Sequence, residues 1–299
     1  RPPRSTQSRS SAASDVYKRQ IQDNLWGHMA QLNQRLNGRG VPNLEGVLKE
    51  IRLRPLHHAF RSLVNREMFH RLMEARLFKS SDSLDKKLMD EIEQKSRSFY
   101  QGVKGLAERT EEEQVLAREI RLKLEAILYL PIITSRPQVL QPRGVKAIAE
   151  YLHRRLLEGP SIWGTLFGWL FLHPIGKVAG SENVPELSSR LAVEWGLDPI
   201  IAEALMDLGL EEGLAKRWTG LIKILTRHQR WFEQENPYRI LENLFRDEEA
   251  QQFLGVNRYN NILWFNKEAF EELLWWMMLT AALEAVSYTH LTLPTIYSV

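Results

Sequence analysis

The chain has 299 residues, 43% of them hydrophobic, which is enough to bury a substantial core in one large domain or two smaller ones. It contains no cysteine, so its own residues exclude disulfides, cysteine-ligated zinc and thiol catalysis, and a reducing compartment such as the cytoplasm is slightly favoured. Its 40 Lys and Arg against 37 Asp and Glu give a formal charge of +3, which taken alone suggests a nucleic-acid or anionic-lipid partner.

The two ends of the chain are not expected to belong to the fold. Residues 10–20 (SSAASDVYKRQ) and 286–295 (VSYTHLTLPT) can be translated from opposite strands of one DNA sequence, which resembles the adapter that a transposase joins to both ends of a sequencing fragment. We therefore interpret 1–20 and 286–299 as translated, disordered adapter that flanks a piece of a longer protein. The first twenty residues hold five basic residues and one acidic residue, and the last fourteen hold no charge, so 35 basic residues remain against 36 acidic ones, a formal −1. The basic signal belongs to the adapter, and no nucleic-acid partner is expected.

Residues 21–130 show helical periodicity and are predicted to form an N-terminal helical subdomain. Apolar residues from Leu44 to Ile51 recur at i, i+3, i+4 and i+7, the spacing of one helix face. Pro55 suits the first turn of a helix, so a longer helix is predicted to begin there. Residues 110–113 (TEEE) form a capping box ahead of a further helix.

Residues 131–143 contain three prolines and little charge, so they are predicted to link two helical subdomains. Residues 144–285 resume the helical period and form the second one. No alternating run is long enough to indicate a strand, except a short extended piece at 260–265 at most. The sequence therefore predicts an all-α fold, an irregular multi-helix array with two helical subdomains.

Helix starts within the second subdomain are indicated by capping residues. Asp198-Pro199 and Asn236-Pro237 each have the pattern of a cap followed by a first-turn proline. Asn266 is expected to cap the final helix.

Two apolar stretches must be covered by other groups. Residues 162–172 span eleven residues, whereas a membrane span needs roughly 20, so a buried or interfacial helix is predicted and no membrane span. Residues 273–279 (LLWWMML) are apolar on every side of their helix, and such a helix must be surrounded. We expect part of its covering to lie outside this chain.

No motif of catalysis, metal binding or cofactor binding occurs. The chain has no GxxxxGK[ST], GxGxxG or GxSxG sequence and no HExxH, and His57, His58 and His70 lack the spacing of metal ligands. Nine tryptophans are many for this length, and large aromatic residues of this kind fill helical cores or bind sugars through their faces. We expect no catalytic residue, no metal and no cofactor in this chain.

Three segments stand out, in this order: LNGRGVPNLEGVLKEIRLRPLHHAFRSLVNREMF (36–69), WGTLFGWLFLHPIGKV (163–178) and FLGVNRYNNILWFNKEAFEELLWWMM (253–278). Together they resemble a long helical region that follows the catalytic barrel in large bacterial proteins of the α-amylase family of glycoside hydrolases. The catalytic Asp, Glu and second Asp of that family, with their barrel strands, are absent, so no catalytic residue is carried over. The resemblance implies a non-catalytic accessory region, structural or substrate-positioning, in a parent glycosidase or glucanotransferase. Its implied partners are the upstream barrel of the same polypeptide and an α-glucan.

The residues best suited to contact carbohydrate or a partner are Arg258, Tyr259, Asn260 and Trp264. They form a polar and aromatic loop ahead of a capped helix, and loops on rigid scaffolds carry binding functions. The alternative is a helical protein-interaction module unrelated to carbohydrate, which the apolar stretches 162–172 and 273–279 favour because both need partners.

Overall fold

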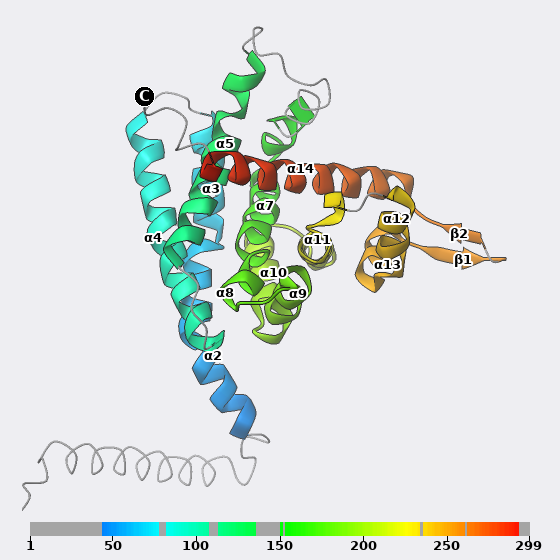
Figure 1. Ribbon diagram of the computed structural model, residues 1–299, viewed down its shortest axis with the longest axis horizontal. Coiled ribbons are helices and arrows are strands. Elements are labelled where there is room, and N and C mark those ends of the chain that lie inside the picture. The colour runs from blue at the N-terminus through cyan, green and yellow to red at the C-terminus, as the bar shows by residue number, and fades with distance from the viewer. Residues whose placement is uncertain are drawn as a thin grey trace, which may run out of the picture. The chain divides into compact units, whose positions relative to one another are not determined.

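The computed structural model describes residues 44–77, 82–107, 113–135, 150–151, 153–233, 236–260 and 262–292. These residues form a multi-helix array with one small two-stranded sheet (Figure 1), which confirms the predicted all-α class. Contacts divide the chain into two units, 1–53 and 54–299. The described part of the first unit is helical, and all of the packing reported below belongs to the second.

The helices before the central part of the chain are α2 (Leu44–Leu63), α3 (Arg66–Leu77), α4 (Asp82–Ala107) and α5 (Glu113–Ser135). The central helices are α7 (Pro160–Leu172), α8 (Ile175–Val178), α9 (Val184–Glu194), α10 (Leu197–Asp207) and α11 (Glu212–Arg227). After the short 3₁₀ helix η1 (Trp231–Glu233) come α12 (Pro237–Arg246), α13 (Glu248–Leu254), β1 (Asn257–Tyr259), β2 (Ile262–Trp264) and α14 (Lys267–Thr292).

The core is built around α7. Every residue from Ile162 to Leu172 is buried, which confirms that this apolar stretch is an interior helix. A Cβ atom on Gly164 would lie 2.8 Å from Leu205, and one on Gly168 would lie 2.9 Å from Ile222. The two glycines therefore let α10 and α11 approach α7 closely, and α3 packs against α7 as well. Among the described residues, no helix combines the length and the apolar character that crossing a membrane requires.

The helix expected to begin at Pro55 begins earlier. α2 is continuous from Leu44 and carries Pro55 in its interior, where proline removes one backbone hydrogen bond. Leu56, Phe60 and Leu63 follow at helical spacing, and each is at most 1% exposed. Burial of this apolar face outweighs the cost of the proline, and the prediction of a helix start at Pro55 was wrong.

The structure describes only the first five residues of the expected linker. Residues 131–135 are the last residues of α5, so Pro131 lies inside a helix, while 136–149 are outside the described residues. α5 packs against α14, and α3 packs against α7 and α10. Helices from before and after the proline-rich stretch therefore share one unit, and the contacts place the boundary at 53/54 instead.

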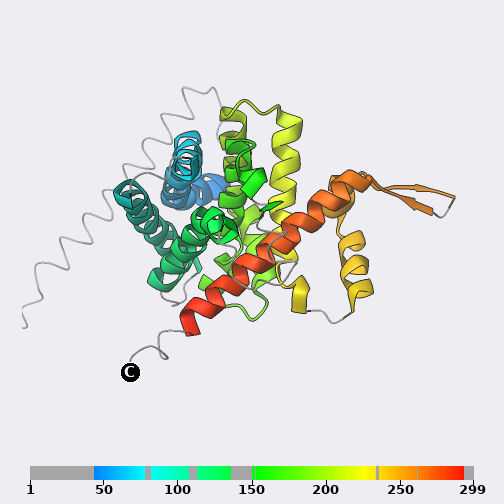
Figure 2. The ribbon, with the colours of Figure 1, turned by 90° about the horizontal axis from the view of Figure 1, so that it is seen from above.

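α14 runs across the unit from α13 to α5 (Figures 1 and 2). Asn266 precedes it and caps it as predicted, since its Oδ1 accepts from the backbone N–H of Ala269 at 2.8 Å. Within the apolar run 273–279, Leu273 and Trp276 are at most 3% exposed. Helices of the same unit cover much of this run, and the expectation that part of its covering lies outside this chain stays a prediction. The helix continues to Thr292, past the expected end of the fold at 285.

Candidate functional site

The four residues proposed to contact a ligand lie in or beside a β-hairpin. β1 and β2 are antiparallel, with Asn257 opposite Trp264, Arg258 opposite Leu263 and Tyr259 opposite Ile262. Asn260 follows β1 with a positive φ of 49°, a conformation that asparagine tolerates and that tight hairpin turns require. The short extended piece expected at 260–265 is therefore one strand of a hairpin whose other strand precedes it.

The hairpin is anchored at its base and extends beyond α12 and α13 (Figures 1 and 2). The ring of Phe265 packs 5.4 Å from that of Phe245 in α12 and 5.3 Å from that of Phe270 in α14. The backbone N–H of Asn266 donates to the carbonyl of Leu254 at 2.8 Å, which closes the base. Two helices thus hold the hairpin in place.

The register decides which side chains share a face. Directly opposed residues of an antiparallel pair point to the same side, and neighbours along a strand alternate. Tyr259, Ile262 and Trp264 therefore lie on one face together with Asn257, whereas Arg258 lies on the other with Leu263. Tyr259 is 69% and Trp264 is 61% exposed. The four candidates do not form one cluster: two aromatic rings share a face, Asn260 is in the turn, and Arg258 points away.

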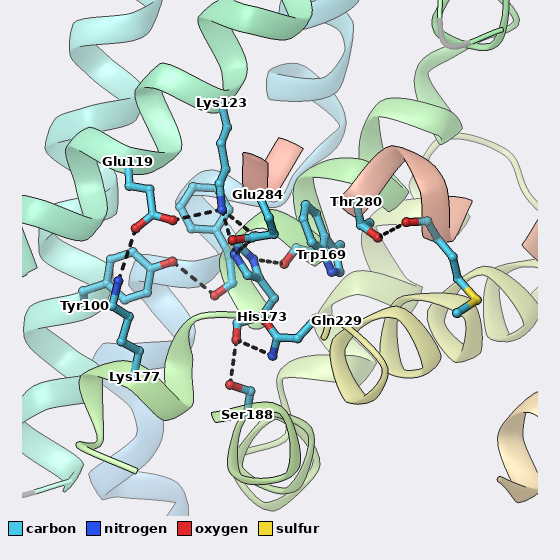
Figure 3. A network of polar contacts seen from close by, with 12 residues as sticks. Tyr100, Glu119, Lys123, Trp169, His173, Lys177, Ser188, Gln229, Thr280 and Glu284 are labelled. Atoms are coloured by element: carbon cyan, nitrogen blue, oxygen red, sulfur yellow. Dashed lines mark hydrogen bonds and ion pairs between the residues drawn. The ribbon is translucent and has the colours of Figure 1, made fainter. Parts of the chain in front are cut away.

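A second group of functional-type side chains is buried between helices (Figure 3). Lys123 of α5 is its centre, with a fully buried side chain. Its Nζ lies 2.6 Å from Oε1 of Glu284 in α14, 3.0 Å from Oε1 of Glu119 in α5 and 3.1 Å from Nε2 of His173, which follows α7. We call these four residues the Lys123 cluster. It joins three segments that are far apart in the sequence.

The imidazole of His173 is held in one orientation. Its Nδ1 lies 3.0 Å from the carbonyl oxygen of Trp169, and its ring stacks on the indole of Trp169 with centroids 4.3 Å apart. Its own carbonyl accepts from Ser188 Oγ at 2.7 Å and from Gln229 Nε2 at 3.3 Å. Nε2 is therefore the nitrogen that faces the ammonium of Lys123 and the carboxylate of Glu284.

The cluster lowers the pKa of both of its carboxyl groups. Burial alone would raise the pKa of Glu284, but the charges and hydrogen bonds of His173 and Lys123 outweigh it and hold that pKa well below the usual range. Burial likewise opposes ionisation of Glu119, whose pKa is lowered by the neighbouring lysines. Burial, followed by the negative charge of Glu119, raises the pKa of Tyr100 well above its usual value.

Glu119, His173 and Glu284 are close enough together to raise the question of a metal ion, since their ligand atoms lie within 4.8 Å of one another. The ammonium of Lys123 fills the position that a cation would take and contacts all three groups. A metal would need ligand distances near 2.0–2.2 Å and could not share that space. The cluster is a closed ion network in which lysine supplies the positive charge.

Sequence comparison adds no assignment to either site. No protein family, no curated protein and no solved structure matches this chain. The resemblance to the helical region of the α-amylase family therefore stays a prediction.

Proposed function

We propose that this chain is a non-catalytic helical accessory region that positions α-glucan for an α-amylase-like catalytic domain of the same polypeptide. The observation that carries the proposal is the pair of exposed rings, Tyr259 and Trp264, on one face of a hairpin anchored to the helices. Their strand positions are diagonal neighbours, with Cα atoms roughly 7–8 Å apart in such pairs. Two rings at this separation offer a platform on which adjacent sugar rings can stack.

The chemistry of this face suits a neutral sugar. Its remaining residues are Asn257, whose amide can both donate to and accept from hydroxyl groups, and the apolar Ile262. None of the described residues on the face is a carboxylate, so the face offers no acid and base for glycoside cleavage. Binding without hydrolysis is the role that these residues support.

A second candidate is a protein-binding hairpin. The apolar stretches that first favoured an interaction module are largely buried inside the fold, so they no longer count for it. Ile262 is 57% and Leu263 is 44% exposed, however, and a partner strand could pair with the hairpin edge and cover them. This reading requires a protein partner and no sugar.

Calorimetric titration of the full chain with maltoheptaose tests the proposal. We expect saturable heat in the millimolar range, weakened about two- to tenfold in Trp264→Ala, because an aromatic contact contributes roughly 0.5–1.5 kcal/mol. Leu263→Ala is the matched control on the opposite face and should bind as the wild type does. Cellohexaose, a β-linked glucan, checks the linkage preference. Absence of saturable heat with maltoheptaose would overturn the glucan proposal and leave the protein-binding hairpin.

A further inference from the structure

A small pocket of about 150 Å³ is lined by the C-terminal end of α11, by η1 and by α12. We call it the His228 pocket. None of its described lining residues is acidic, and three of them carry or can gain a positive charge, namely Arg227, His228 and Arg230. The rest of the lining is Trp231, Ile240 and Asn243. Such a wall suits a negatively charged group and does not suit a metal ion.

The imidazole of His228 is held in one orientation. Its Nε2 lies 2.9 Å from Oδ2 of Asp247. The pKa of Asp247 is lowered to about 2, so this group stays a carboxylate over the pH range in which histidine titrates. A carboxylate only accepts hydrogen bonds, so Nε2 donates and Nδ1 is the nitrogen that can take up a proton. That Nδ1 has no hydrogen-bond partner in the described part of the chain, and the side chain is 14% exposed.

The counter-charges beside the pocket leave donors free. Asp247 is a single buried carboxylate that Arg227 and His228 share, at 2.7 and 2.9 Å. Arg230 pairs with Glu233 through Nε alone, and because both side chains are about half exposed this pair contributes little. The two terminal nitrogens of Arg230 have no partner among the described residues. Once His228 is protonated, three cations therefore share two carboxylates.

The positions of the donors indicate the shape of the anion. His228 follows α11, Arg230 precedes η1 and Asn243 lies in α12, so the donors reach the pocket from three segments. A tetrahedral oxyanion presents oxygens in several directions, whereas a carboxylate presents two in one plane. The negative end of the α11 dipole opposes an anion, but this effect is weaker than a charge-assisted hydrogen bond.

We propose that the His228 pocket binds a tetrahedral oxyanion, the phosphate group of a small ligand, and that binding tightens when His228 is protonated. The donors are Nδ1–H of His228, the terminal nitrogens of Arg230 and the amide of Asn243. Asp247 is a positioning residue that holds the imidazole. The site shares no residue with the hairpin and does not depend on the glucan proposal.

Calorimetric titration of the full chain with sodium sulfate tests the site. Sulfate keeps its charge between about pH 5 and 8, where histidine titrates, so any pH dependence of binding belongs to the protein. We expect saturable binding in the millimolar range at about pH 5.5 and at least about threefold weaker binding at about pH 7.5. His228→Gln should bind weakly and equally at both pH values. Arg230→Gln should weaken binding about threefold or more at each pH.

Each variant has a matched control outside the pocket lining. His58 is an exposed histidine of α2, and Arg239 is an exposed arginine of α12. His58→Gln and Arg239→Gln should bind sulfate as the wild type does. Circular dichroism and thermal melting verify folding, and the exposed Arg230 keeps the test decisive if His228→Gln does not fold.

Inorganic phosphate and phenyl phosphate, compared at one pH, distinguish a free phosphate from a phosphate monoester, and saturable binding of either supports the pocket. Absence of saturable heat with sulfate at the lower pH would overturn the proposal. Sulfate binding that is the same in His228→Gln and Arg230→Gln as in the wild type would also overturn it.

Discussion

The ammonium of Lys123 is fully buried, yet each of its three N–H donors has an acceptor within 3.1 Å, on Glu119, His173 and Glu284. A buried ion network of this kind contributes little compared with apolar packing, but it is costly to break. Removing the lysine would leave two ionised carboxylates facing each other inside the fold. Lys123 therefore adds little net stability, but its removal is expected to be strongly destabilising.

We predict that Lys123→Met destabilises the chain by about 3–5 kcal/mol, measured by urea unfolding, because it removes the buried counter-charge that Glu119 and Glu284 share. Lys177→Met is the matched control, since Lys177 contacts the same Glu119 at 3.5 Å but its side chain is 46% exposed. That variant should stay within about 1 kcal/mol of the wild type. Equal effects from the two variants would contradict this account of the cluster.

Asp247 gives a prediction about acid. Burial raises its pKa, but the hydrogen bond from His228 and the charge of Arg227 outweigh burial and lower the pKa to about 2 from an ordinary 3.8. Because the pKa is lower in the folded state, the stabilisation is fully present above pH 4 and is lost as the pH falls toward about 2. Its size is about 2 kcal/mol.

Asp247→Asn removes this titration while keeping an oxygen to cap α13, where Oδ1 accepts from the N–H of Glu249 at 3.0 Å. We expect the variant to be less stable than the wild type at neutral pH and the difference to shrink between pH 4 and 2, followed by urea unfolding at each pH. The exposed Asp207 supplies the control, and Asp207→Asn should keep the wild-type slope. Parallel curves for Asp247→Asn and the wild type would show that Asp247 contributes no acid sensitivity.

At the scale of the element, helix glycines should separate into two kinds. Gly220→Ala is predicted to stabilise the chain by about 0.5–1 kcal/mol, because alanine is the better helix former and its Cβ meets only open space. Gly164→Ala should destabilise it by about 1–3 kcal/mol, because its Cβ would lie 2.8 Å from Leu205. Thermal melting of the two variants checks both signs. Destabilisation by Gly220→Ala would mean that the glycine serves the fold itself.

Local signals in the sequence predicted elements well where the cause is local. Asn236 and Asn266 cap their helices as expected, because a cap needs only backbone N–H groups two or three residues ahead. Asp198 was expected to cap a helix that begins at Pro199. α10 begins at Leu197 instead, so Asp198 lies in its first turn. At Pro55 the local preference was overruled by burial of Leu56 and Phe60 on the same helix. Tertiary packing decides such positions, and one sequence does not display it.

The sites were less accessible to prediction. Tyr259 and Trp264 were proposed from the sequence, because an aromatic and polar loop can be recognised without contacts, and their role stays a prediction. The separation of Arg258 from the two aromatic residues was missed, since it depends on a register that includes Asn257 in the preceding strand. The Lys123 cluster left only one signal, the i,i+4 pair of Glu119 and Lys123, and its other members come from segments with no shared spacing.

At the scale of the whole second unit, the apolar stretches connect helices from both sides of the expected linker. Residues 162–172 form the interior helix α7, against which α3 packs from before the proline-rich stretch and α11 from after it. The run 273–279 in α14 is buried in large part, and α14 packs against α5. α7 packs on α3 and α14 packs on α5, so each apolar stretch contacts a helix that begins before the expected linker.

This arrangement predicts that the helices on both sides of 131–143 unfold together. Phe69 in α3 and Leu273 in α14 are both 0% exposed, and truncating either to alanine should cost about 2–5 kcal/mol. In a single cooperative transition, each variant shifts the whole urea curve, whether it is followed by near-ultraviolet or far-ultraviolet circular dichroism. Leu214 is exposed, so Leu214→Ala is the control and should change the free energy of unfolding by less than about 0.5 kcal/mol. The contrary result would be two separate transitions, with Phe69→Ala shifting only one of them and Leu273→Ala only the other. Each truncation would then destabilise its own core, and the chain would have two independent subdomains.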